Sequence, residues 1–187
     1  WWFLSLTALC LLGLIVGYER SYHGRAAGMR KRNSRLKVNE VEAYTIVALL
    51  KACLEQKEYD GKTFGVISLL GDEQGEVVNE IIRRKIGDFG LIHEREIICG
   101  NAASFQGDER DVIFLTMVDD DSTVRNVMRD DIAKRYNVAA SRAKDQLWVV
   151  HSFDYQKLRA EDLRHGLLEY AEHFQSHLDA MYAVSSL

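Results

Sequence analysis

Two segments of the chain gather polar and charged side chains directly ahead of an apolar run. The first, Ser-Phe-Gln-Gly-Asp-Glu-Arg-Asp at residues 104–111, leads into Val-Ile-Phe-Leu at 112–115. The second, Arg-Tyr-Asn-Val-Ala-Ala-Ser-Arg-Ala-Lys at residues 135–144, comes shortly before Leu-Trp-Val-Val at 147–150. The apolar runs are typical of buried strands, so each polar segment is expected in a turn or at a helix end beside a strand. Loops at strand edges bind ligands in open parallel sheets, which makes these segments the candidate site.

Arg142 is the side chain whose chemistry is most definite. A guanidinium is permanently charged and presents a planar fork that suits phosphate oxygens. A single arginine near the end of a helix can equally be a surface cation. The choice between these two interpretations depends on the motif in which Arg142 stands.

The two segments together resemble motifs V and VI of superfamily 1 helicases, in the branch that includes the nonsense-mediated decay helicase. The order Phe-Gln-Gly-x-Glu before a β-branched strand matches motif V, and motif VI follows at a suitable distance. Residues 64–85 resemble the motif IV region, and the resemblance as a whole covers about residues 38–168. The chain departs from the commoner pattern at 101–103, where it has Asn-Ala-Ala and many relatives carry Thr-Val-Asp.

The resemblance implies a role for each residue of a nucleotide cleft. Arg142 is implied to be an arginine finger that reaches across to ATP and stabilises charge on the transferred γ-phosphoryl group. Gln106 and Gly107 are implied to line the cleft, and Glu109 to help bind the nucleotide through its sugar or through water near the phosphates. Arg135 is implied to make a second contact in the cleft.

Nucleic-acid contacts are implied for two further residues. Ser104 is expected to contact a phosphate through its hydroxyl or its backbone, although the departure at 101–103 bears directly on this contact. Lys144 is expected to contact the nucleic-acid strand. The resemblance leaves open whether that strand is DNA or RNA.

The fold that the resemblance implies is α/β, a three-layer α/β/α RecA-like domain with a mainly parallel sheet. The implied function is that of the C-terminal motor domain of an ATP-dependent helicase, which binds single-stranded DNA or RNA. Its partner is a first RecA-like domain, which makes most of the contacts to ATP and Mg²⁺. The alternative is a RecA-like module that binds nucleic acid or protein without turnover.

The 187 residues contain no complete phosphate-binding P-loop. Gly61, Lys62 and Thr63 look like the end of one, but Gln56 stands where the motif needs its first glycine. The expected helix also precedes this tripeptide instead of following it, so a turn is predicted. Because the P-loop and the acidic Mg²⁺-binding motif are both missing from these residues, we expect no ATPase activity from the isolated chain.

The elements that position these segments are visible in the hydrophobic pattern. Asn39 is a plausible N-cap for a helix that extends to about residue 53. The remaining expected elements are a strand at 64–70, a helix from 71 with three basic residues near its end, a strand at 95–100, a strand from 112 to 118, a helix over 130–144, a strand at 147–150 and a helix over 155–170 with Leu158, Leu163, Leu167 and Leu168 inward. Three aspartates at 119–121 follow the strand expected at 112–118. They could hold Mg²⁺, but an exposed acidic loop is the favoured interpretation.

Composition restricts the remaining possibilities. The net charge of −4 and the pI of about 5.9 give no global basic footprint, so nucleic acid must bind through a local patch. The three cysteines, Cys10, Cys53 and Cys99, are widely spaced, so neither a metal site nor a disulfide framework is predicted. A reduced, cytoplasmic setting fits this cysteine usage.

The first 35 residues lie outside the resemblance. Residues 1–18 are almost wholly apolar and are followed by basic residues. Three interpretations remain open: a membrane anchor, which is not favoured; a remnant of an upstream domain; or sequence unrelated to the fold, produced by a frame error. The predicted organisation is this segment at 1–35, a second RecA-like domain at 36–170 and a tail at 171–187.

Overall fold

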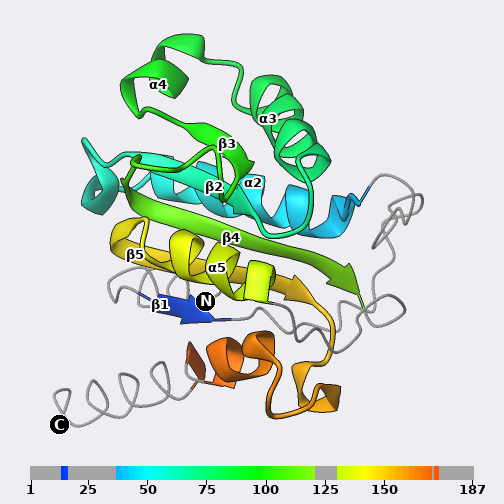
Figure 1. Ribbon diagram of the computed structural model, residues 1–187. Coiled ribbons are helices and arrows are strands. Elements are labelled where there is room, and N and C mark those ends of the chain that lie inside the picture. The colour runs from blue at the N-terminus through cyan, green and yellow to red at the C-terminus, as the bar shows by residue number, and fades with distance from the viewer. Residues whose placement is uncertain (1–13, 17–36, 121–129, 170, 173–187) are drawn as a thin grey trace, which may run out of the picture.

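The computed structural model describes residues 14–16, 37–120, 130–169 and 171–172. Its centre is a parallel sheet in which the strands follow the order β1-β5-β4-β2-β3 (Figure 1). The strands are β1 (Leu14–Val16), β2 (Phe64–Ser68), β3 (Ile98–Asn101), β4 (Arg110–Asp120) and β5 (Ala143–Ser152). The two long strands β4 and β5 lie next to each other.

Helices cover both faces of the sheet. They are α2 (Glu40–Leu54), α3 (Glu73–Lys85), the short α4 (Phe89–Glu94) and α5 (Asp130–Ala140), with single 3₁₀ turns at η1 (Lys57–Tyr59) and η2 (Tyr155–Lys157) and a further helical stretch at 163–169. Figure 1 shows α5 in front of the sheet and α2 behind it. This arrangement is the predicted three-layer α/β/α fold of RecA type, and the prediction is confirmed.

Each face of the sheet has its own hydrophobic core, because successive strand residues point to opposite faces. On one face, α2 and α3 pack against alternate residues of β2, β4 and β5, and the core includes Ile46, Leu50, Val78, Ile82, Phe64, Val66, Phe114 and Trp148. On the other face, α5, the 102–109 segment and the C-terminal helical stretch pack against the intervening residues, and that core includes Phe105, Tyr136, Ala139, Leu168, Ile67, Ile113, Leu115 and Val149.

Most predicted elements are present with shifted ends. Asn39 is the N-cap of α2, as predicted, and its Oδ1 accepts a hydrogen bond from the Glu42 N–H. The helix predicted over 130–144 ends at Ala140, because the chain turns at 141–142 and enters β5. The continuous helix predicted over 155–170 is wrong: a 3₁₀ turn comes first, and the helical stretch starts at residue 163. Leu163 is 45% exposed instead of inward.

The N-terminal apolar segment contributes the short edge strand β1, whose three residues pair in parallel with β5. The rest of residues 1–18, where the membrane-anchor interpretation would apply, lies outside the described residues. Within the described ranges, no helix combines the length and hydrophobicity that crossing a bilayer requires.

Candidate functional site

The two candidate segments meet at the amino edge of the sheet, where β4 and β5 begin. The Arg110 N–H donates to the carbonyl oxygen of Arg142 over 3.0 Å, and Arg110 stands opposite Ala143 in the ladder. Ligands in open α/β sheets usually bind at the carboxyl ends of the strands. Both segments precede their strands, however, so the site that they form lies at the opposite edge.

The 102–109 segment crosses one face of the sheet between β3 and β4. The Phe105 ring is fully buried and lies over Gly65 of β2, where an added Cβ would come within 2.7 Å of it. The chain then turns at Gly107, whose φ of +87° strongly favours glycine, and a Cβ there would meet nothing within 4 Å. Gln106 and Glu109 flank this turn and are exposed.

Ser104 lies at the other end of the crossing, near the carboxyl end of β3. Its N–H donates to Asn101 Oδ1 over 2.8 Å, and its hydroxyl donates to the Asn101 carbonyl oxygen over 2.9 Å. Asn101 pairs with Ser68, the last residue of β2. Both donors of Ser104 therefore already have an acceptor at the β3 end of the crossing.

Arg142 leads directly into β5 from the turn that ends α5. The Ser141 N–H continues the helical pattern by donating to Asn137 O over 3.1 Å, and the half-buried Arg142 donates from Nε to Val138 O over 3.2 Å. These contacts fix the stem of the side chain. Within the described ranges, no carboxylate lies within ion-pair distance of the Arg142 guanidinium, although nearby Arg95 and Arg110 are each paired with acids.

The other two predicted cations are exposed. Arg135 lies on α5, two helical turns before Arg142. Lys144 lies in a bulge of β5, because three residue steps of β5 span two of β4 between Arg110 and Val112. Bulges re-aim side chains and are common next to active sites. Both Lys144 and its neighbour Asp145 are exposed as a result.

The Gly61–Thr63 tripeptide joins the same edge as a turn, and that prediction is confirmed. Gly61 has φ +74°, with η1 before it and β2 after it. Lys62 pairs with Asp145. Thr63 donates to Asp111 from its N–H over 2.7 Å and from its hydroxyl over 2.8 Å. Burial alone would raise the pKa of Asp111, but the two Thr63 bonds and the nearby lysines outweigh it and hold that pKa below its usual range.

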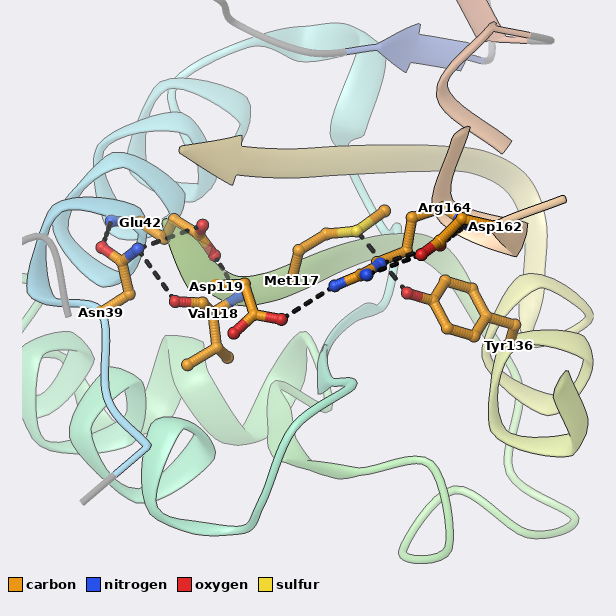
Figure 2. A network of polar contacts seen from close by, with 8 residues as sticks. All are labelled: Asn39, Glu42, Met117, Val118, Asp119, Tyr136, Asp162 and Arg164. Carbon is orange, nitrogen blue, oxygen red and sulfur yellow. Dashed lines mark hydrogen bonds and ion pairs between the residues drawn. The ribbon is translucent and has the colours of Figure 1, made fainter. Parts of the chain in front are cut away.

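A second polar cluster lies at the carboxyl edge and centres on the buried Glu42 of α2 (Figure 2). The sequence did not predict it. Its Oε1 accepts from Ser152 Oγ over 2.7 Å and from Asn39 Nδ2 over 3.2 Å. Its Oε2 accepts from the Val118 N–H over 2.8 Å and from the Thr116 hydroxyl. Burial raises the pKa of Glu42 to about 7, against the opposing effect of these hydrogen bonds.

Val118 is held by this cluster in an unusual conformation. Its φ of +68° is a true outlier for a β-branched residue. Besides the bond to Glu42, its carbonyl oxygen accepts from Asn39 Nδ2 over 3.1 Å. The strain lies where β4 is irregular against β5, between Thr116 and Asp120. Hydrogen bonds from the N-terminal residues of α2 thus hold Val118 in a backbone conformation that would be unfavourable on its own.

Asp119 and Asp120 are the last two residues of β4 and are not part of the exposed acidic loop that the sequence favours. Asp119 is only half-buried, but it pairs with the buried Arg164 over 2.9 Å, and Asp120 is 7% exposed at the end of β4. Arg164 also forms a two-pronged pair with Asp162, with 3.0 Å from Nε to Oδ1 and 2.7 Å from Nη2 to Oδ2. Figure 2 shows this triad beside Tyr136. Residue 121 lies outside the described residues.

A parallel sheet with helices on both faces makes this chain a three-layer α/β/α domain of RecA type. Residues 18–154 match the model of a family described as an AAA domain. The match covers more than two thirds of the chain, so the chain belongs to this AAA domain family, which occurs in superfamily 1 helicase-like proteins. No curated protein matches the sequence.

Proposed function

We propose that this chain is the second motor domain of an ATP-dependent superfamily 1 helicase, in the branch of the nonsense-mediated decay helicase. In this proposal it completes an ATP site whose P-loop and Mg²⁺ ligands belong to a first RecA-like domain. The observation that carries the proposal is the meeting of two sequence motifs at one edge. The Glu109 turn and Arg142 are more than 30 positions apart, yet a direct hydrogen bond from Arg110 to Arg142 joins them.

The side chains at this edge fit a nucleotide. The exposed amide and carboxylate of Gln106 and Glu109 flank a glycine turn with open space, as contacts to a sugar or to bound water require. ATP supplies the γ-phosphoryl group, on which negative charge grows during transfer. Arg142 would stabilise that charge, because its stem is fixed by Val138 and no described carboxylate neutralises it. Arg135, two turns earlier on α5, would make a second contact.

Single-stranded nucleic acid is the proposed second ligand. Lys144 supports this part, since the β5 bulge leaves its ammonium exposed in a chain whose net charge is negative. A phosphate contact by Ser104 would require it to give up one of its two bonds to Asn101. Lys144 is therefore the stronger candidate, and its loss should weaken binding with little dependence on base sequence.

The test is to combine the full chain with a first RecA-like helicase domain that carries a P-loop, and to measure ATP hydrolysis with and without single-stranded RNA or DNA. The chain alone should hydrolyse no ATP, and the combination should. Arg142→Ala should lower the combined rate by about 10³-fold or more. The matched control is Arg83→Ala, which removes an exposed arginine at the end of α3. It should leave the rate unchanged.

Two results would count against the proposal. ATP hydrolysis by the chain alone, abolished by Arg142→Ala, would mean that the site is not shared with a first domain. Nucleic-acid binding without any hydrolysis in the combination would favour the alternative, a RecA-like module that binds without turnover.

A further inference from the structure

Arg110 is a buried cation that joins the two halves of the candidate site. It is the first residue of β4 and is only 6% exposed. Its Nε donates to the Glu96 carbonyl oxygen over 3.0 Å, and its Nη1 donates to the Glu109 carbonyl oxygen over 2.8 Å. Its backbone N–H donates to Arg142 over 3.0 Å. The side chain therefore ties the end of the 102–109 segment to Glu96, and the main-chain N–H of the same residue joins it to Arg142.

The charge of Arg110 is balanced locally. Nη2 lies 3.7 Å from a carboxylate oxygen of Glu96, and Nη1 lies 3.5 Å from one of Asp108. A buried charge is costly unless it is paired and hydrogen-bonded, and Arg110 meets both conditions. An apolar residue would avoid this cost and extend the buried run of β4. It could not hold the Glu109 carbonyl.

The shape of the guanidinium matters as much as its charge. Glu96 has φ +46°, an unfavourable value for a non-glycine residue, and its carbonyl oxygen is one of the two that Arg110 binds. A planar group with several donors can hold two carbonyls in fixed directions at once, whereas an ammonium is a point charge on a flexible stem. A lysine at position 110 would keep the ion pairs but could not make both of these hydrogen bonds in fixed directions.

We infer that Arg110 is a positioning residue for the proposed nucleotide site: its guanidinium anchors the Glu109 turn to Glu96, and this anchoring sets where the main chain of residue 110 meets Arg142. It contacts no nucleotide in this scheme and acts through those two residues. The inference rests on the proposed function for its consequence in nucleotide binding. Its structural part, that Arg110 orders Arg142 and the glycine turn, can be tested without nucleotide.

Arg95 provides a matched control. It is 8% exposed, lies at the same edge ahead of β3, and donates from Nη1 to the Tyr59 carbonyl oxygen over 2.9 Å. Its acid partners are Asp60 and Glu94. In the part of the chain that the structure describes, no hydrogen bond or ion pair joins Arg95 to Glu109 or Arg142. Replacing Arg95 therefore removes a guanidinium of similar burial that has no direct contact with Glu109 or Arg142 in the described part of the chain.

The experiment follows two NMR signals in the ¹⁵N-labelled full chain, the Arg142 Nε–H and the Gly107 amide. They are recorded first in the chain alone, and then during titration with Mg·ATP after an unlabelled first RecA-like helicase domain that carries a P-loop has been added. The variants are Arg110→Met, Arg110→Lys and Arg95→Met, each checked for cooperative thermal unfolding. Arg110→Met should shift and broaden both signals before any nucleotide is added. It should also weaken Mg·ATP binding about tenfold, which is the size of effect expected from losing the two hydrogen bonds of the guanidinium. Arg110→Lys should act in the same direction to a smaller extent, and Arg95→Met should leave both signals and the affinity unchanged.

The outcomes separate the inference from the proposed function. If the wild-type signals do not respond to Mg·ATP in that combination, the proposed function fails, while the nucleotide-free signals of the variants still decide the role of Arg110. If Arg110→Met is folded and keeps both signals at wild-type positions, the inference is wrong. It is equally wrong if Arg95→Met perturbs them as strongly. If Arg110→Met does not fold, the same comparison between Arg110→Lys and Arg95→Met decides.

Discussion

Replacing the buried carboxyl of Glu42 by an amide should change how the stability of the domain depends on pH. Glu42 is 1% exposed in the first turn of α2, and donors from β4, from β5 and from the N-cap of its own helix surround its two oxygens. Burial raises its pKa from 4.5 to about 7, the hydrogen bonds lower it, and nearby Asp119 raises it further. The variant Glu42→Gln keeps the size of the side chain and removes its titration.

The sign of the effect follows from proton binding. Between pH 4.5 and about 7 the native chain holds a proton on Glu42 that the unfolded chain has lost. The contribution of this group to stability is therefore fully present below pH 4.5 and is lost as the pH rises through about 7. At about 1.4 kcal/mol per pH unit, the total loss is about 3 kcal/mol, and most of it falls between pH 5 and 8. That is a large fraction of the about 5–15 kcal/mol by which domains are usually stable.

The measurement is the free energy of urea unfolding at pH 5, 6, 7 and 8 for the wild type and for Glu42→Gln. The amide disturbs the donors around it, which adds a nearly constant cost at every pH. The informative quantity is the difference between the two proteins. Glu42→Gln should gain about 2–3 kcal/mol relative to the wild type from pH 5 to pH 8. Glu76→Gln, an exposed first-turn glutamate of α3, is the matched control and should show no such trend.

A flat difference between wild type and Glu42→Gln, within about 0.5 kcal/mol over this range, would refute the reasoning. It would mean that Glu42 is ionised throughout, because its four donors outweigh its burial. A difference of the opposite sign would mean that the hydrogen bonds lower the pKa of Glu42 below that of the unfolded chain.

Three further substitutions test the packing and the backbone of the same domain by urea unfolding. Gly65→Ala should cost about 1–3 kcal/mol, because its Cβ would overlap the buried Phe105 ring; a loss below about 0.5 kcal/mol would mean that the 102–109 crossing is loosely packed. Gly107→Ala should cost about 1–2 kcal/mol through its φ of +87° alone, since no atom obstructs the new methyl group. An unchanged stability would mean that the turn readily changes conformation. Arg164→Met should cost about 3–5 kcal/mol because it removes the buried cation that pairs with both aspartates. The exposed Arg83→Met at the end of α3 should cost less than about 0.5 kcal/mol, and equal effects would rule out the buried triad.

The local features of the chain were predictable because short-range rules specify them. The side chain of Asn39 caps α2 through the N–H of a residue three positions away, which any helix start would allow. The apolar runs before and after the candidate segments became strands, since their length and β-branched content suit a buried parallel sheet. The end of α5 was placed four residues too late, because small apolar residues continue the helical pattern past Ala140 and no glycine or proline marks the turn.

Glu42 shows what such rules cannot supply. Its position in the first turn of α2 is favourable to the helix dipole, but that short-range rule names none of its hydrogen-bond partners. Its actual donors at Thr116, Val118 and Ser152 lie 74 to 110 positions further on. Only the packing of α2 across the ends of β4 and β5 makes it a buried acceptor. The exposed acidic loop predicted after β4 was wrong for a similar reason, because Arg164 lies 45 positions beyond its partner Asp119.

The sequence by itself indicated the fold class, through the resemblance that its motifs carry. It also marked the two segments of the candidate site, because motif order and hydrophobic pattern are properties of neighbouring residues. The tertiary structure alone decided which of those residues come together. It joined the Glu109 turn to Arg142 through Arg110 and placed Ser104 at the far end of the same crossing. The physical reason is the parallel sheet: its register brings the starts of β4 and β5 side by side, and no local pattern in the chain specifies that register.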